Sequence, residues 1–261
     1  MRKTIIFIFC LVLLFFNFNT EIKGLLLQLN SFDQMKRLLL IVITISCYTL
    51  PVTLLLNYKM QVISFNELLW FILNSSFIAG TFSYYLIYQL DNFIIKNSSI
   101  SLLGAALEEV LKALAFILAF FLIYKKNKYN ILNIFAFASL LGLGFQMYED
   151  YIYFLNSVDQ GSIIFLKSMF ERLSNSISSH WMYTGITSFG IITLLEKNIT
   201  KSISMLLLIS PAVLHIIWNS SWNNSTFISS ILSAITVYLY FYSYKTAYDY
   251  SQNTNGFHFK V

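Results

Sequence analysis

The segment "SSISLLGAALEEVLKALAFILAFFLIYKK", residues 98–126, combines a long apolar run with three charges placed well inside it. A helix needs about 20 apolar residues to span the hydrocarbon core of a bilayer, and this run meets that length. Glu108, Glu109 and Lys112 lie within two turns of one another. Each ionisable group at the bilayer centre costs on the order of 2.5–3.5 kcal/mol. The segment therefore predicts a membrane helix. Its three charges make insertion less favourable, so they are expected to serve another purpose.

The composition of the whole chain agrees with a membrane protein. Of the 261 residues, 57% are hydrophobic and only 11% are charged. An ordinary soluble domain carries about a quarter charged residues, so that class is excluded. The net charge of +5 does not indicate nucleic acid, because the basic residues concentrate in loops. Cys10 and Cys47 lie in apolar segments, where neither a disulfide nor a thiolate metal site is expected. We predict an all-α, polytopic transmembrane helical bundle.

The apolar runs predict about eight membrane spans. They lie near 4–18, 37–56, 67–89, 99–124, 131–155, 174–195, 202–222 and 226–247, while 91–98 and 160–173 are expected to be interfacial or loop segments. The first span resembles a signal peptide, but no small-residue cleavage site follows it, which favours a retained anchor. We divide the chain into N-terminal spans (1–98), a catalytic helical core (99–222), and a last span with its tail (223–261).

Basic loops predict the orientation. "KKNK" at 125–128, "EKNITK" at 196–201 and the tail after Lys245 fall on one side of the predicted bundle. Because Lys and Arg favour cytoplasmic loops, both termini are expected in the cytoplasm. The 99–124 helix then starts at the outer face. We expect a multi-pass protein of the cell membrane, in keeping with a bacterial cytoplasmic membrane.

The three charges of the 99–124 helix suggest a chemical use. Lys112 follows Glu108 by four residues and Glu109 by three, so its ammonium can reach either carboxylate. If it neutralises one, the other is left in a low-dielectric site and can act as a general base. An ion pair that only fixes helix packing is the alternative, but it leaves a surplus carboxylate unexplained.

Further polar residues occur in the following spans: Phe145, Glu149, Asp150, His180, His215 and Asn219. Phe145 and Glu149 are four residues apart and share a helix face, as do His215 and Asn219. Asp150 is expected at the membrane interface, as a solvated end. Counting about 1.5 Å per residue from the outer helix ends, the ionisable side chains fall in one layer of the outer half. The sequence therefore predicts a single site that is open toward the extracytoplasmic side.

Such a set of groups favours hydrolysis of an amide bond. A carboxylate at 108 or 109 would deprotonate water, and His180 or His215 would hold that water or donate to the oxyanion, with Asn219 as a second donor. A zinc site is conceivable from the same side chains, but the sequence lacks HExxH and the groups come from four helices. We expect neither a metal nor another cofactor.

Four motifs resemble those of the PrsW family of intramembrane proteases. "EEVLK" at 108–112 resembles its EExxK motif, and "FQMYE" at 145–149 is similar to its FxxxE motif. "HWMYTGITSFG" at 180–190 and "HIIWN" at 215–219 resemble its later histidine motifs. The agreement covers roughly residues 100–220. Asp150 stands where the family often has Asn.

The resemblance implies membership in the superfamily of CAAX prenyl proteases and bacteriocin-processing enzymes. It also implies glutamate-dependent cleavage of a membrane-anchored, anti-sigma-factor-like protein from the outer side. The predicted catalytic residues are Glu108, Glu109, Glu149, His180, His215 and Asn219, with Lys112 and Phe145 in supporting roles. The expected partners are the lipid bilayer and a single-pass membrane protein or lipophilic peptide as substrate.

Three other functions stay open at this stage. A prenyl-protein or peptide-processing protease of the sister family is one, although its FxxxH motif is replaced here by "FQMYE". A proton-coupled transporter would use the same residue types, but we find no inverted repeat. A non-enzymatic peptide-binding immunity protein could keep every motif residue. The sequence leaves open which of Glu108 and Glu109 is the base, and the oligomeric state.

Overall fold

The computed structural model describes residues 39–40, 42–44, 100–123, 130–196 and 200–253, and within these the regular structure is helical. The elements are α5 (Ile100–Ile123), α6 (Ile131–Val158), α7 (Ser162–Asn175), the 3-10 helix η2 (Ser176–Ser178), α8 (His180–Glu196), α9 (Lys201–Trp218) and α10 (Thr226–Asn253). The all-α prediction is confirmed for this part of the chain. The predicted spans near 4–18 and 67–89, and most of that near 37–56, lie outside the described residues.

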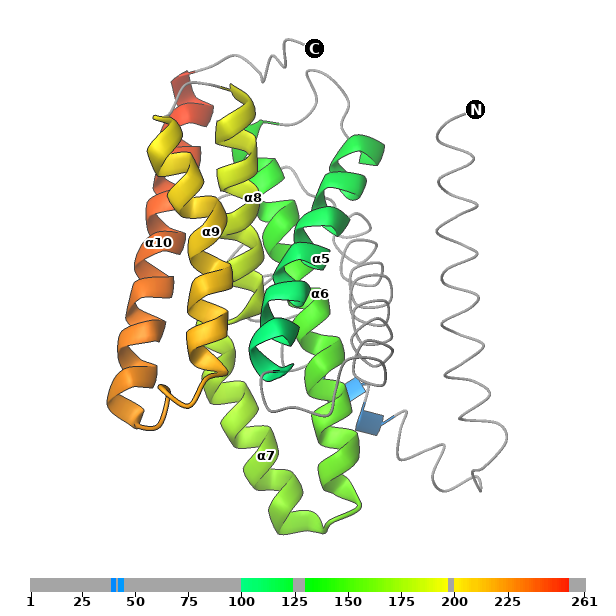
Figure 1. The fold of residues 1–261 in the computed structure, drawn as a ribbon. Coiled ribbons are helices and arrows are strands. Elements are labelled where there is room, and N and C mark those ends of the chain that lie inside the picture. The colour runs from blue at the N-terminus through cyan, green and yellow to red at the C-terminus, as the bar shows by residue number, and fades with distance from the viewer. Residues whose placement is uncertain (1–38, 41, 45–99, 124–129, 197–199, 254–261) are drawn as a thin grey trace.

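Helix α8 lies at the centre of the described bundle. It packs most extensively on α6 and α9, and α5 and α10 complete its surroundings (Figure 1). Phe135 of α6, Ile186 and Phe189 of α8, and Leu207 of α9 are almost fully buried where these helices meet. The core is therefore built around α8, whose first residue is His180.

Alternating helix directions bring the polar segments to one end of the bundle. Helices α5 and α8 begin at the end where α6 and α9 finish (Figure 1). Glu108 and His180 lie early in their helices, whereas Glu149 and His215 lie late in theirs. Residues far apart in sequence therefore come to a similar height along the bundle axis.

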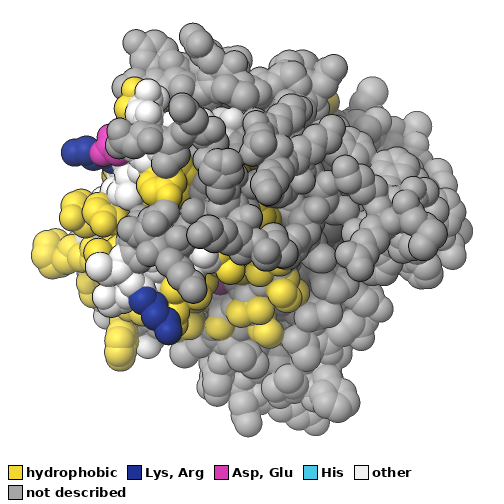
Figure 2. Space-filling view, turned by 90° about the horizontal axis from the view of Figure 1, so that it is seen from above, with side chains coloured by type: hydrophobic (Ala, Val, Ile, Leu, Met, Phe, Trp, Pro, Cys, Tyr) yellow, Lys and Arg dark blue, Asp and Glu magenta, His cyan; other side chains and the backbone are white. Residues whose placement is uncertain are grey.

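The described helices carry apolar surfaces suited to lipid. By length and composition, α6, α9 and α10 are able to cross a membrane. Leu206, Ile209, Phe227 and Tyr238 of α9 and α10 are exposed, and the view from above shows hydrophobic side chains on the outer side of the described helices (Figure 2). The total of eight spans stays a prediction.

The segment before α8 differs from the expectation. Residues 160–173, predicted as interfacial or loop, form most of α7, and the helix expected from 174 begins only at His180. The Ser- and Asn-rich stretch between them competes for backbone hydrogen bonds: Ser176 Oγ donates to the Leu173 carbonyl at 2.6 Å. Helix α7 therefore ends here, and a new helix, α8, begins at His180.

A close approach between α8 and α9 gives a stability prediction. A Cβ on Gly190 would lie 2.6 Å from Leu208 N and 2.9 Å from Ser204 O, both backbone atoms of α9. Gly190→Ala is expected to destabilise the protein by about 1–3 kcal/mol, because the two helices must separate. Thermal unfolding in detergent measures the loss. Gly104→Ala is the control, since a Cβ there meets no atom of the described residues within 4 Å; equal losses for the two variants would contradict the prediction.

Candidate active site

The site contains a buried ion pair between Glu109 and Lys112. Lys112 Nζ donates to Glu109 Oε1, and the two side chains are only 1% and 3% exposed. Lys112 Nζ also donates to His180 Nδ1 at 2.8 Å and lies 4.7 Å from the centre of the Phe145 ring. A buried ammonium is tolerable only when its hydrogen bonds are satisfied, and here a carboxylate, an imidazole and an aromatic face surround it.

His215 joins α9 to the same carboxylate. Its Nδ1 donates to Glu109 Oε1 at 2.9 Å. Its Nε2 lies 3.9 Å from Glu108 Oε2 and 3.3 Å from Asn219 Nδ2. Asn219 is the C-cap residue of α9, so the helix end sets the position of its carboxamide.

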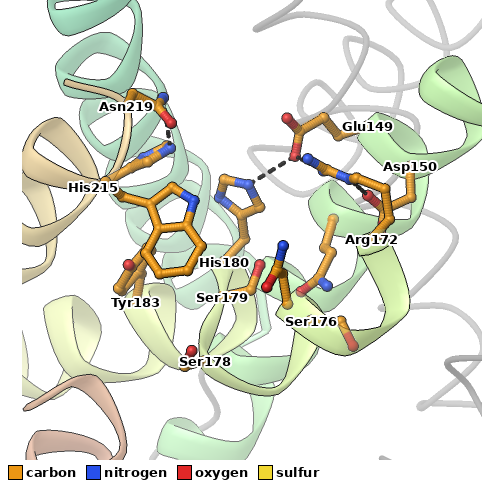
Figure 3. A pocket seen from close by; sticks show the side chains of 13 residues that line it. Glu149, Asp150, Arg172, Ser176, Ser178, Ser179, His180, Tyr183, His215 and Asn219 are labelled. Atoms are coloured by element: carbon orange, nitrogen blue, oxygen red, sulfur yellow. Dashed lines mark hydrogen bonds and ion pairs between the residues drawn. The ribbon is translucent and has the colours of Figure 1, made fainter. Parts of the chain in front are cut away.

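His180 lies near two carboxylates: its Nδ1 is 3.9 Å from Glu109 Oε1, and its Nε2 contacts Glu149 of α6. His180 Nε2 donates to Glu149 Oε2 at 2.8 Å, and the same oxygen accepts from Arg172 Nη2 at 2.7 Å (Figure 3). Arg172 Nε donates to Asp150 Oδ1, whose side chain is buried. Burial alone would lower the pKa of Arg172, but Glu149 and Asp150 outweigh it and hold that pKa above its usual range, so the guanidinium stays charged.

The partners define the protonation of both imidazoles. An ammonium has donors and no acceptor, so His180 Nδ1 must accept and the proton of this ring sits on Nε2. A carboxylate accepts, so the His215 proton sits on Nδ1. The remaining lone pair of His215, on Nε2, then accepts from Asn219 Nδ2 at 3.3 Å, and Glu108 Oε2 lies 3.9 Å from the same nitrogen. This assignment follows from the hydrogen-bond network and makes both rings neutral.

Glu108 differs from Glu109 in its surroundings. Among the described residues, Glu108 Oε2 and Glu109 Oε2 both lack a hydrogen-bond donor, but the other oxygen of Glu109, Oε1, accepts from Lys112 and His215. A water beside Glu108 Oε2 would find an acceptor in that oxygen, whereas the lone pair of His215 Nε2 is occupied by Asn219 Nδ2. The geometry therefore distinguishes Glu109, whose carboxylate is ion-paired, from Glu108, whose carboxylate is able to take a proton.

A small polar cavity adjoins the two histidines, and Glu108 is not among the described residues that line it. It measures about 70 Å³, and Glu149, His180, His215 and Asn219 line it together with Gln146 and Arg172 (Figure 3). At about 30 Å³ for each water, it has room for roughly two. Its size suits a nucleophilic water better than a bound peptide, so a substrate would have to widen it.

The eight residues singled out from the sequence thus lie in one connected network. Their catalytic roles stay predictions, and Phe145 supports the network by packing its ring 4.9 Å from that of His180. Asp150 was wrongly expected to be a solvated helix end, since it is buried against Arg172. Sequence reasoning missed Arg172 and Gln146. The signal that could have identified Arg172 is its charge: it is a cation eight residues before His180, and the predicted site had more carboxylates than cations.

A helical bundle with apolar outer faces and a buried layer of carboxylates and imidazoles defines a membrane-embedded protein with a hydrolase-like site. The family profile described as "PrsW family intramembrane metalloprotease" matches residues 35–246. The chain belongs to the PrsW family of intramembrane proteases, and membership implies intramembrane peptidase activity. No curated protein and no solved structure matches the chain.

The family description implies a metal, and the geometry allows a test of fit. One ligand atom each of Glu108, His180 and His215 lies within 4.8 Å of the others, and two imidazoles with a carboxylate occur in zinc hydrolases. However, the Lys112 ammonium uses the one lone pair of His180. A divalent cation would have to displace this ammonium and then lie beside it. The donors fit in type, but their arrangement does not fit a resident metal.

Proposed function

We propose that the protein is an endopeptidase that cleaves a membrane-anchored protein with a water activated by Glu108, without a metal. The observation that carries the proposal is that Glu108 Oε2 has no donor among the described residues and lies 3.9 Å from His215 Nε2, while Glu109 is ion-paired with Lys112 and accepts from His215. A carboxylate in that position is a general base within reach of one water.

The residues present support a complete hydrolytic cycle. Water donates one proton to Glu108 and its oxygen attacks the scissile carbonyl carbon, forming a tetrahedral oxyanion. Asn219 Nδ2 is placed to donate to that oxyanion. The C–N bond then breaks as Glu108 returns the proton to the leaving nitrogen. Glu109 and Lys112 stay paired throughout and hold His215 and His180 in place.

The proposed substrate is a single-pass, anti-sigma-factor-like membrane protein, or a lipophilic peptide. The apolar outer faces of α9 and α10 support entry from the bilayer, and the predicted topology would open the site to the outer half. We further propose a bacterial cytoplasmic membrane location with both termini in the cytoplasm.

The test compares the N-terminal peptides of membrane proteins between cells that express the native chain and cells that express Glu108→Gln at equal levels. We expect new termini at or near a membrane span with the native chain alone, which would also identify the substrate. Identical termini in both cultures, with the variant inserted and folded, would overturn the proposal in favour of a peptide-binding protein.

Metal removal gives a separate prediction. Purified protein dialysed against a chelator is expected to keep its cleavage rate, because Lys112 supplies the cation of the site. Elemental analysis should find zinc far below one equivalent per chain. Loss of cleavage that zinc restores, with no recovery on adding magnesium, would contradict this prediction and replace the metal-free mechanism.

A further inference from the structure

We propose that Arg172 is a positioning residue of the active site, which holds Glu149 against His180 and thereby keeps the His180 ring in one orientation and one tautomer. No motif of the sequence analysis includes this arginine. Its consequence for catalysis rests on the proposed function, but its effect on His180 does not.

The contacts of Arg172 fix its guanidinium from two sides. Nη2 donates to Glu149 Oε2 at 2.7 Å, and Nε donates to Asp150 Oδ1. The guanidinium carbon also lies 4.2 Å from the centre of the Tyr153 ring. The planar guanidinium contacts two carboxylates and an aromatic ring, so it has little freedom to rotate. A lysine ammonium could not reproduce this geometry.

Glu149 transmits that constraint to His180. A single oxygen, Glu149 Oε2, accepts from both Arg172 Nη2 and His180 Nε2. Without the guanidinium, the carboxylate could turn toward the cavity that it lines. His180 would then lose its acceptor, and its Nδ1 would no longer be held toward Lys112.

Arg172 comes from helix α7, which lies mostly at the surface and also supplies Asn175 to the lining of the cavity. Helix α7 has no fully buried side chain, and Ile163 and Phe170 are largely exposed. Lys167 and Glu171, on the same helix, pair at 3.8 Å at the surface. Among the charged side chains of α7, Arg172 is therefore the one aimed into the site, since Lys167 and Glu171 are 75% and 59% exposed.

The first test observes His180 directly and needs no substrate. The chain has three histidines, so ¹⁵N-histidine labelling in a His258→Asn background leaves His180 and His215. We expect the Nε2–H tautomer for His180 and the Nδ1–H tautomer for His215. With Arg172→Gln, the His180 signal is expected to broaden or become a mixture of tautomers, while Lys167→Gln, with the same charge loss, leaves it unchanged. An unchanged His180 signal in folded Arg172→Gln would overturn the inference.

The second test measures kinetics on a fluorescent peptide that spans the cleavage site found by the terminal-peptide experiment. Arg172→Gln is expected to lower kcat by about 10²-fold with little change in KM, the usual effect of misplacing a group by about 1 Å. Glu149→Gln should act similarly, and the double variant should be no slower than the worse single variant. A KM effect without a kcat effect would overturn the inference.

Arg172→Lys covers the case in which Arg172→Gln does not fold. An ammonium can reach one carboxylate at a time, so we expect partial mixing of the His180 tautomers and a kcat roughly tenfold lower. Native behaviour in both measurements would overturn the two-sided role of the guanidinium. If the native chain cleaves nothing, the proposed function fails, but the His180 spectra still decide whether Arg172 positions that ring.

Discussion

Replacing Glu108 with glutamine is expected to lower the rate of peptide cleavage by about 10³-fold while the protein stays folded. A carboxamide cannot take a proton from water, and a positioned general base contributes roughly 10²–10⁴-fold. The substitution leaves no charged partner stranded, because Glu108 Oε2 accepts no hydrogen bond from the described residues. Single-turnover cleavage and thermal unfolding, measured on the same preparation, give the two quantities.

Glu109→Gln provides the decisive comparison. It removes the anion that Lys112 and His215 contact, so stability should fall together with activity. Glu171→Gln is the matched control, since Glu171 is exposed on α7, and it should change neither. A native cleavage rate in Glu108→Gln would exclude Glu108 as the general base. A loss of stability in Glu108→Gln as large as in Glu109→Gln would contradict the division of roles between the two carboxylates.

Replacing Lys112 with methionine is expected to produce the largest loss of stability, about 3–5 kcal/mol. The pair it forms with Glu109 is almost fully buried, and removing one member strands the other charge in a low-dielectric interior. The carboxylate keeps its contact with His215, but it loses its cation. Denaturant or thermal unfolding in detergent measures the effect.

The double variant Lys112→Met with Glu109→Gln tests the reason for that loss. With both charges absent, part of the stability should return, because the penalty comes from the unpaired carboxylate more than from the missing contact. Lys167→Met is the control: its salt bridge with Glu171 lies at the surface and is worth at most about 1 kcal/mol. A double variant no more stable than Lys112→Met alone would show that the ion pair is not the cause.

Much of the site could be predicted from the sequence because helix geometry is local. Spacings of three and four residues place Glu109 near Lys112 and His215 near Asn219, and the structure has both contacts. Counting residues from helix ends predicted one layer of ionisable groups, since the rise of a helix is constant. The same reasoning could not find Arg172, whose partners lie 22 and 23 residues away on another helix.

The sequence by itself determined that this is a helical membrane protein and which polar residues need burial, because apolar length and residue spacing are local properties of the chain. Only the tertiary structure decided which carboxylate pairs with Lys112. Lys112 lies about one helical turn after both Glu108 and Glu109, so the spacing alone does not show which of the two carboxylates it pairs with. His215, from a helix about a hundred residues later, lies beside Glu109 and donates to it. Hydrogen bonds between distant helices thus hold Glu109 and leave Glu108 Oε2 without a donor among the described residues, because only packing brings such donors together.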